Sequence, residues 1–325
     1  MAAHQPATAS FAGLVDLAAE RYGGRALVAS DEFFAEKENL LKPGRGVFIE
    51  DKYTDRGKWM DGWESRRKRG PGHDWCVIQL GWRGVIRGLD IDTNHFLGNH
   101  PPYASVEAAG SAEGPWTEIL PRAPLHPGSQ NLFAVQSTQA WSHVRLNIYP
   151  DGGVARFRVF GEVTPAAAAP GEPVDLAGLA AGGRAVACSD QFFSNANNML
   201  QPGDSLFMGD GWETRRRRGP GHDWAIVRLA RRALIRSVRV GTQHYKGNFP
   251  DGCSLEICDA GAAHVDVLNA AQQAWTEILP RTQLAADAQR DFAAELKVPG
   301  PATHLRVNIY PDGGISRLRV FAVPT

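Results

Sequence analysis

Residues 61–75 read DGWESRRKRGPGHDW and residues 210–224 read DGWETRRRRGPGHDW, so the chain carries nearly the same segment twice. Further segments recur in the same order. They are SDEFF and SDQFF at 30–34 and 189–193, NHFLGN and QHYKGN at 94–99 and 243–248, WTEILPR at 116–122 and 275–281, and RLNIYPDGG and RVNIYPDGG at 145–153 and 306–314. A period of roughly 160 residues is far longer than one solenoid unit, so the pattern indicates duplication of a whole domain.

The repeats also define the domain boundaries. The spacing between the copies shortens through the DGWE segment because residues 50–59, EDKYTDRGKW, occur only in the first copy. The Pro/Ala-rich stretch TPAAAAPGEP at 164–173 lies between the copies, and such a composition is typical of a linker. We therefore predict a first repeat at 1–163, a linker at 164–173 and a second repeat at 174–325.

Within each copy, apolar residues recur with a period of two, as in half-buried strands. In RLNIY, Leu146 and Ile148 are expected to face a core, while Arg145, Asn147 and Tyr149 face the other side. The PDGG that follows predicts a turn, since Pro fixes φ and Gly accepts positive φ. Only two short segments have a helical pattern, 11–21 and 285–296. The sequence thus predicts an all-β chain with two tandem β-sandwiches.

Composition argues against several classes of protein. The 35 Lys and Arg residues are balanced by 35 Asp and Glu, whereas nucleic-acid-binding proteins usually carry a basic excess. No apolar run reaches the roughly 20 residues of a transmembrane helix, and the N-terminus lacks a signal-peptide pattern. We expect a cytoplasmic protein that binds neither nucleic acid nor membrane. Each of the four cysteines is replaced by alanine at the equivalent position of the other copy, which indicates small buried side chains.

The basic run of the repeated segment is expected to be a loop, because it precedes a Gly-Pro-Gly turn. Arg66 and Arg67 are arginine in both copies, whereas Lys68 is replaced by Arg217. No aromatic residues alternate with these cations, as a nucleic-acid stacking surface would require. Two interpretations remain open: internal ion pairs with nearby acids, or a clamp for a small anion, since guanidinium binds a carboxylate through two hydrogen bonds.

Histidines and tryptophans of the shared motifs are further candidates for a site. His73 and His95 lie at strand ends near acidic residues, where an imidazole can act as an acid or base. Trp63 lies in a polar loop and is a candidate wall of a small-ligand pocket; the other paired tryptophans are expected in the core. The spacing of His, Asp and Glu matches no familiar metal motif, so a metal site stays undecided.

Taken together, the chain resembles the allantoicase family. The resemblance rests on DGWExRRxRxxGHDW, H(F/Y)xGNxP, WxEILPR and R(L/V)NIYPDGGxxRxRV, each present in both halves, and it covers nearly all of residues 25–325. It implies two tandem jelly-roll β-sandwich domains of the galactose-binding-like, discoidin-type fold in a homo-oligomer. It also implies hydrolysis of allantoate to ureidoglycolate and urea, in purine degradation.

The implied substrate suggests roles for the candidate residues. Its carboxylate would suit Arg66, Arg67 or Arg122, and its ureido groups would suit Asp61, Glu64, Asn147 and Tyr149. Proton transfer would be divided between a histidine, His73 or His95, and a carboxylate, Glu64 or Glu118. The equivalent candidates of the second repeat are Asp210, Trp212, Glu213, Arg215 and His222. A bound divalent metal is an alternative way to polarise the substrate.

Three questions are left open by the sequence. Both copies keep the motifs, so the chain has two sites, one shared site or one working site. Residues 50–59 either complete the site of the first repeat or form an oligomer contact or a mobile loop. A pair of non-catalytic modules that bind a small ligand or a carbohydrate is the rival to an enzyme, because one fold hosts both functions.

Overall fold

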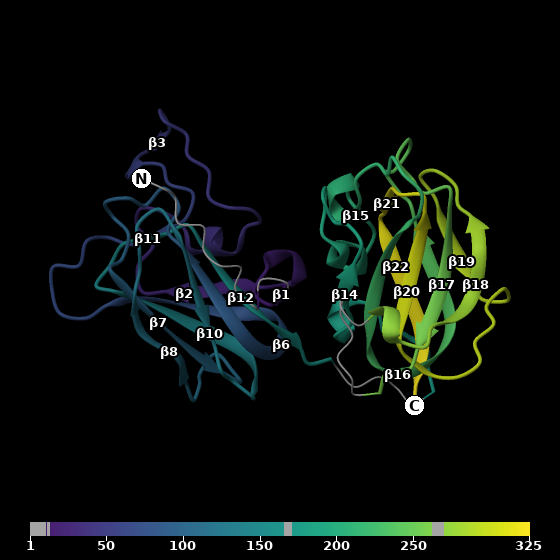
Figure 1. The fold of residues 1–325 in the computed structure, drawn as a ribbon. Helices are drawn as coiled ribbons and strands as arrows, with labels where there is room; N and C mark the ends of the chain where they lie inside the picture. Colours follow the sequence, from purple (N-terminus) through teal and green to yellow (C-terminus); the bar gives the residue numbers. More distant parts are fainter. Residues whose placement is uncertain (1–10, 12–13, 166–170, 262–269) are drawn as a thin grey trace. The chain divides into compact units, whose positions relative to one another are not determined.

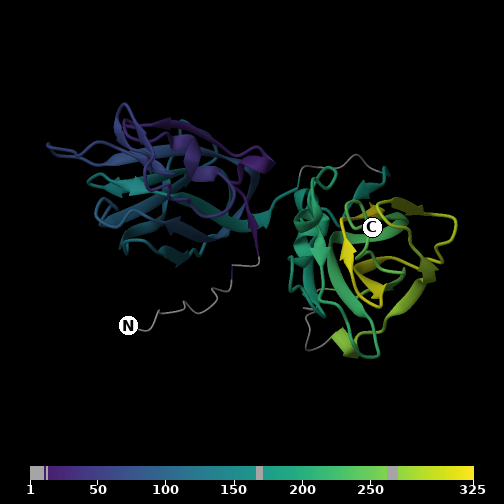
Figure 2. The ribbon, with the colours of Figure 1, turned by 90° about the horizontal axis from the view of Figure 1, so that it is seen from above.

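The computed structural model describes residues 11, 14–165, 171–261 and 270–325. The chain divides into two compact units, Met1–Thr164 and Pro165–Thr325, and each is a separate set of packed strands (Figures 1 and 2). Part of the expected linker, 166–170, lies outside the described residues. No helix in the described part of the chain is long and apolar enough to cross a membrane.

The first repeat consists of short strands and single 3-10 turns. Its elements are β1 Val15–Asp16, η1 Glu20–Tyr22, β2 Arg25–Ala29, η2 Lys37–Leu41, β3 Tyr53–Thr54, β4 Gly57–Lys58, β5 Trp63–Glu64, β6 Asp74–Asp92, β7 Tyr103–Ala109, β8 Thr117–Pro124, β9 Gln130–Ala134, β10 Ala140–Tyr149, β11 Gly153–Val154 and β12 Arg156–Val163.

The second repeat has the same order of strands without the β3–β4 pair, and two further 3-10 turns, η5 and η6. They are β13 Val174–Asp175, η3 Leu179–Ala181, β14 Arg184–Cys188, η4 Ala196–Leu200, η5 Met208–Asp210, β15 Trp212–Glu213, β16 Asp223–Gly241, β17 Gly252–Cys258, η6 Ala270–Gln272, β18 Thr276–Gln283, β19 Gln289–Phe292, β20 Ala302–Tyr310, β21 Gly314–Ile315 and β22 Arg317–Pro324.

The strands of the first repeat form two packed sheets. One long strand, β6, belongs to both of them. Its first part, Asp74 to Gln79, pairs with β10 and, from Cys76 on, with β2. Its second part, Gly84 to Asp92, pairs with β12 and, from Gly88 on, with β9. β7 and β8 extend the first sheet beyond β10, giving the order β2-β6-β10-β7-β8. β16 has the same double role in the second repeat, where the first sheet is β14-β16-β20-β17-β18.

The core lies between the two sheets. Leu146 and Ile148 of β10 and Leu89 of β6 are fully buried, together with Phe157 of β12, because alternate residues of a strand point to the same face. The prediction of an all-β chain with two tandem β-sandwiches is confirmed. The helical pattern of 11–21 and 285–296 was wrong in the described part of these segments, which holds β1, the start of η1 and β19 instead.

Residues 50–59 form a projecting hairpin, because β3 pairs with β4. Tyr53 at its start is 65% exposed. The Lys52 ammonium lies 3.6 Å from the centre of the Trp59 ring, and the Lys58 ammonium donates to the Glu50 carbonyl at 2.7 Å. These contacts hold the hairpin to itself, and none of them reaches the polar face described below.

Asp90 of β6 gives the fold a dependence on pH. One of its carboxylate oxygens accepts from Gln130 Nε2 at 2.7 Å, and the other is buried without a partner. Burial raises the pKa of Asp90 from 3.8 to about 6. Since the native carboxyl has the higher pKa, ionising Asp90 destabilises the native state above about pH 6, and this cost disappears below about pH 4.

We therefore expect Asp90→Asn to raise the free energy of unfolding by about 1–3 kcal/mol near pH 8, and to leave it unchanged near pH 3.5. Guanidinium unfolding at the two pH values measures the difference. Asp92→Asn is the matched control: it breaks the ion pair with Arg45, so it should lower stability at pH 8. Equal effects of Asp90→Asn at both pH values would refute the assignment.

Candidate functional site

A polar surface covers the outer side of the first sheet in the first repeat; we call it the outer face. Because side chains alternate, the residues next to the core positions of β10 point outward. The register places Asn147 opposite both Trp75 of β6 and Ser105 of β7. Arg145 is opposite Glu107 of β7, which is in turn opposite Glu118 of β8. The pairing of four strands therefore assembles the outer face.

A chain of hydrogen bonds on the outer face leads to His73. Asn147 Nδ2 donates to Glu107 Oε2 at 2.9 Å and to Ser105 Oγ at 3.2 Å, while Arg145 Nε donates to the same Glu107 oxygen at 2.7 Å. Because a carboxylate only accepts, the Asn147 amide is held with its oxygen toward His73 Nε2, at 3.4 Å. This long hydrogen bond needs a proton on Nε2, which leaves Nδ1 as the basic nitrogen of the neutral ring.

Aromatic rings support the same group of side chains. The rings of His73 and Tyr149 lie 4.6 Å apart, and the Tyr149 hydroxyl is 2.9 Å from Ser105 Oγ. The Arg122 guanidinium lies 4.6 Å from the centre of the Tyr149 ring. Trp116 lies under Arg145 in the same way, at 4.9 Å. Stacked guanidinium groups keep their edges available to an anion.

The second repeat reproduces this arrangement. Asn308 Nδ2 donates to Glu256 Oε2 at 2.7 Å and to Ser254 Oγ at 3.0 Å, and its oxygen is 3.3 Å from His222 Nε2. Here the face is hollowed into a pocket of about 330 Å³, lined by His222, Trp224, Ser254, Glu256, Glu277, Arg306, Asn308 and Tyr310. The same hydrogen-bond network of His, Asn, Glu and Arg side chains therefore occurs in both repeats, as expected for a functional site that was kept after the domain was duplicated.

The carboxylates of the outer face differ in their partners. Burial raises the pKa of Glu256, but hydrogen bonds from Arg306 and Asn308 outweigh burial and hold it below its ordinary value. Glu256 is therefore an anion that fixes its neighbours. Glu277, opposite it on β18, is exposed and lines the pocket. Its equivalent Glu118 is also exposed, so this carboxylate is the one that can meet a ligand.

The structure thus brings together only some of the residues that the sequence singled out. His73, Asn147, Tyr149, Arg122 and Glu118 share the outer face. Residues that the sequence analysis missed complete it: Ser105, Glu107, Arg145, Trp116 and Trp75. Trp75 and Trp116 are half-buried on the outer face, so the expectation that they belong to the core was wrong.

Half of the basic run is engaged in ion pairs of its own repeat. Arg66 binds Asp31 at 2.7 Å, and Lys68 binds the buried Asp74 at 2.8 Å. In the second repeat, Arg215 binds Asp190 at 3.1 Å. Arg67 is exposed, and its side chain has no ion pair among the described residues. Ion pairing is therefore the structural role of Arg66 and Arg215, and the run contributes no group to the outer face.

Asp61 and Trp63 are internal, contrary to their assignment as substrate-binding groups. Asp61 Oδ2 is 2.7 Å from Arg156, and both side chains are almost fully buried. Trp63 is completely buried, and its Nε1 donates to the Asp31 carbonyl at 2.8 Å. The second repeat repeats these contacts with Asp210 bound to Arg317 and Trp212 bound to the Asp190 carbonyl. We correct all four to structural roles, since none presents a surface to a ligand.

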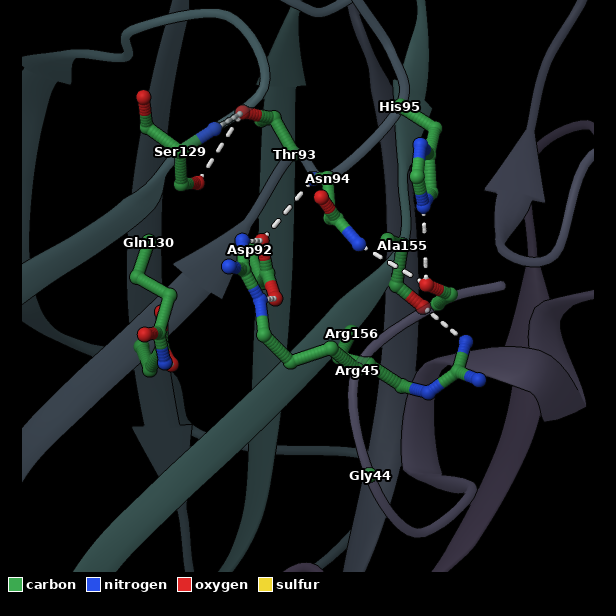
Figure 3. A network of polar contacts seen from close by, with 12 residues as sticks. Gly44, Arg45, Asp92, Thr93, Asn94, His95, Ser129, Gln130, Ala155 and Arg156 are labelled. Atoms are coloured by element: carbon green, nitrogen blue, oxygen red, sulfur yellow. Dashed lines mark hydrogen bonds and ion pairs between the residues drawn. The ribbon is translucent and has the colours of Figure 1, made fainter. Parts of the chain in front are cut away.

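His95 also belongs to a structural network (Figure 3). Its Nε2 lies 3.1 Å from the Gly46 carbonyl, which also accepts from Asn94 Nδ2 at 2.8 Å. The backbone of His95 has φ 67°, so it occupies a turn. Nearby, Arg45 binds Asp92 through two hydrogen bonds of 2.8 Å. His95 therefore fixes a loop, and within the described part of the chain no hydrogen bond joins it to His73.

Glu64 and Glu213 are half-buried and bound by amides. Asn99 Nδ2 donates to Glu64 Oε1 at 2.6 Å, and Asn248 Nδ2 donates to Glu213 Oε1 at 2.5 Å. Burial raises the pKa of Glu64 above its ordinary value, although the hydrogen bond from Asn99 acts against this. Among the described residues, no hydrogen bond or ion pair joins either carboxylate to His73 or His222.

The described residues contain no group of three or more His, Cys, Asp and Glu side chains arranged to hold a metal ion. Around Asn147 the outer face offers one histidine, His73, and two carboxylates, one of which is engaged by Arg145 and Asn147. This donor set does not fit a divalent cation.

Comparison with known proteins gives the family. A family model described as the allantoicase repeat matches residues 15–164 and again 174–325. A protein named probable allantoicase 1 from Burkholderia mallei is 49% identical over 94% of each chain. A probable allantoicase from Rhizobium meliloti is 47% identical over 95% of this chain and 94% of its own. The crystal structure of allantoicase from Saccharomyces cerevisiae superposes with a TM-score of 0.78 at 34% identity, covering 95% of this chain and 92% of that one. The chain therefore belongs to the allantoicase family.

Proposed function

We propose that this protein is a hydrolase that converts allantoate and water to ureidoglycolate and urea. The family supports the reaction. The observation that supports this site is the hydrogen-bond network of His, Asn, Glu and Arg on the outer face of each repeat. In the reaction one C–N bond of the substrate breaks. The water oxygen becomes the hydroxyl of ureidoglycolate, and the leaving urea nitrogen gains a proton.

The outer face suits the charges of this substrate. Allantoate has a central carbon that bears one carboxylate and two ureido groups. The Arg122 guanidinium is exposed and can bind the carboxylate with two parallel hydrogen bonds. Ureido N–H groups need acceptors, and Asn147 Oδ1, Glu118 and the Tyr149 hydroxyl offer them. Asn147 keeps its oxygen toward His73 because Glu107 and Ser105 bind its nitrogen.

Two groups are suited to move protons. We assign His73 as the acid that protonates the leaving urea nitrogen, because Asn147 holds its ring in one orientation. We assign Glu118 as the base that takes a proton from water, because it is exposed and its carboxylate has no hydrogen bond or ion pair to another described residue. Proton transfer by positioned groups typically contributes 10²–10⁴-fold to a rate. His222 and Glu277 are the equivalents in the second repeat.

We further propose that the protein works as a homo-oligomer in the cytoplasm, as the family resemblance implies. Exposed apolar side chains of the second repeat support self-association: Phe192 is 62% exposed, Phe193 61%, Leu206 75% and Phe207 61%. Surface patches of this kind commonly mark interfaces. Sedimentation velocity of the purified chain tests this point, since a monomer at micromolar concentration would contradict it.

An assay of products tests the proposed reaction against the rival binding module. We expect purified protein to release one urea per allantoate consumed, with ureidoglycolate as the second product, in a colorimetric urea assay. Allantoin, in which the carboxylate and one ureido group are closed into a ring, is expected to release none. Saturable binding of allantoate or a sugar without any urea release would favour a non-catalytic module.

A further inference from the structure

The two outer faces differ at one edge, beside the arginine proposed to bind the carboxylate. Arg122 and Arg281 occupy equivalent positions in the repeated WTEILPR segment. Next to them, the first repeat has Pro102 and Tyr103 where the second has Asp251 and Gly252. The backbone is otherwise matched, because Leu125 N donates to the Pro102 carbonyl at 2.9 Å and Leu284 N donates to the Asp251 carbonyl at 3.0 Å.

In the first repeat, Arg122 lies between two aromatic rings. Its guanidinium carbon is 4.7 Å from the centre of the Tyr103 ring and 4.6 Å from that of Tyr149. These tyrosines are opposite each other on β7 and β10. No acidic side chain of the described residues forms an ion pair with Arg122. The guanidinium is therefore held in place while its charge stays available.

In the second repeat, the same arginine already has an anionic partner. Arg281 lies 4.6 Å from the centre of the Tyr310 ring, but opposite Tyr310 stands Gly252, which supplies no second ring. A side chain at this position would collide, since a Cβ on Gly252 would be 2.8 Å from the Thr282 carbonyl oxygen. Arg281 instead binds Asp251 at 3.0 Å.

We propose that the two outer faces have different charge preferences: the first binds carboxylate-bearing ureides, and the second disfavours them because Asp251 neutralises Arg281. This inference rests on the proposed function and specifies which repeat carries it. A carboxylate that approaches Arg281 must displace Asp251 and then lie beside its charge. At Arg122 it meets a free cation already oriented by two rings, so less order is lost on binding.

Ureidoacetate is the probe, because it carries one carboxylate and one ureido group but cannot expel urea from a carbon bearing two ureido groups. Calorimetric titration of the full-length chain is expected to resolve two classes of site, with the first about fivefold tighter, since the Arg281–Asp251 pair is exposed and screened. Arg122→Gln should remove the tighter class and Arg281→Gln the weaker one. Ureidoacetamide, the neutral analogue, should bind both sites equally.

Exchange of the differing residue gives the matched test. Asp251→Asn is expected to tighten the weaker site about fivefold for ureidoacetate and to leave ureidoacetamide binding unchanged. Pro102→Asp, which places a carboxylate opposite Arg122, is expected to weaken the tighter site by a similar factor. Thermal unfolding of each variant checks that the repeat stays folded; if Pro102→Asp unfolds, the Asp251→Asn result decides alone.

Equal affinities of the two sites for ureidoacetate, no binding by either site, or no response to Asp251→Asn would overturn the inference. Urea release from allantoate by the unmodified protein is measured beside these titrations. Urea release with two equal sites would overturn the inference and leave the proposed function intact. Two unequal sites without urea release would overturn the proposed function and keep the charge preference.

Discussion

In a chain whose second outer face is already disabled by His222→Asn, replacing His73 with asparagine is expected to lower kcat/KM for allantoate by about 10²–10⁴-fold, the range lost when a positioned acid is removed. Asparagine keeps a polar group beside Asn147 but cannot deliver a proton. His73 is half-buried at the edge of the outer face, so the thermal midpoint should change little. Urea release at saturating and limiting allantoate separates the effect on kcat from that on KM, and kcat should carry most of it.

His95→Asn is the matched control, because the sequence made both histidines candidates. His95 adopts φ 67° and contacts the Gly46 carbonyl, and asparagine tolerates this left-handed conformation. Its kcat/KM should therefore stay within a small factor of that of the unmodified protein. If adding His73→Asn to the His222→Asn chain gave a folded protein with no further loss of activity, His73 would be removed from the mechanism. Loss of activity in His95→Asn alone would move the site to the loop network.

Replacing Asp61 with alanine is expected to lower the free energy of unfolding more than the other substitutions named here. Arg156, whose side chain is 4% exposed, would keep its charge without its carboxylate partner, and breaking a buried ion pair from one side typically costs about 3–5 kcal/mol. Arg66→Ala is the comparison: its pair with Asp31 is exposed on the arginine side at 63%, so about 1 kcal/mol or less should be lost. Guanidinium unfolding of both variants measures the difference.

The same experiment separates structure from substrate binding. If Asp61 holds the fold, Asp61→Ala should lower stability and leave KM for allantoate unchanged in the fraction that remains folded. An Asp61→Ala protein with unchanged stability and a strongly raised KM would restore Asp61 to the substrate site.

The fold could be predicted because its strands and turns have local sequence patterns, and because both repeats show the same patterns. Alternation in RLNIY fixed which side of β10 faces the core, and the structure buries Leu146 and Ile148 as expected. Residues 285–296 gave a helical pattern because alanine and charged residues dominate them, yet pairing with β16 makes 289–292 a strand. Tertiary pairing overrides intrinsic propensity at such short segments.

The site was harder, because its members come from four strands that are distant in sequence. Strand alternation identified Asn147 and Tyr149 as candidates, and the repeated WTEILPR motif identified Arg122. Glu107 and Ser105 were missed, although both copies share the pattern Ser-x-Glu at 105–107 and 254–256. The polar loop around Trp63 suggested a ligand wall, but whether a loop residue is buried depends on the chain that packs over it, which no local pattern records.

The central claim is that the outer faces hydrolyse allantoate, and the double variant His73→Asn/His222→Asn tests it most directly. The measurement is the initial rate of urea release from allantoate, compared with that of the unmodified protein at equal folded concentration. If the hydrogen-bond network on the outer face is the site, the unmodified protein releases one urea per allantoate consumed. The double variant then releases urea at a rate at least about 100-fold lower. Urea release by the folded double variant at the unmodified rate would show that the chemistry takes place elsewhere in the molecule.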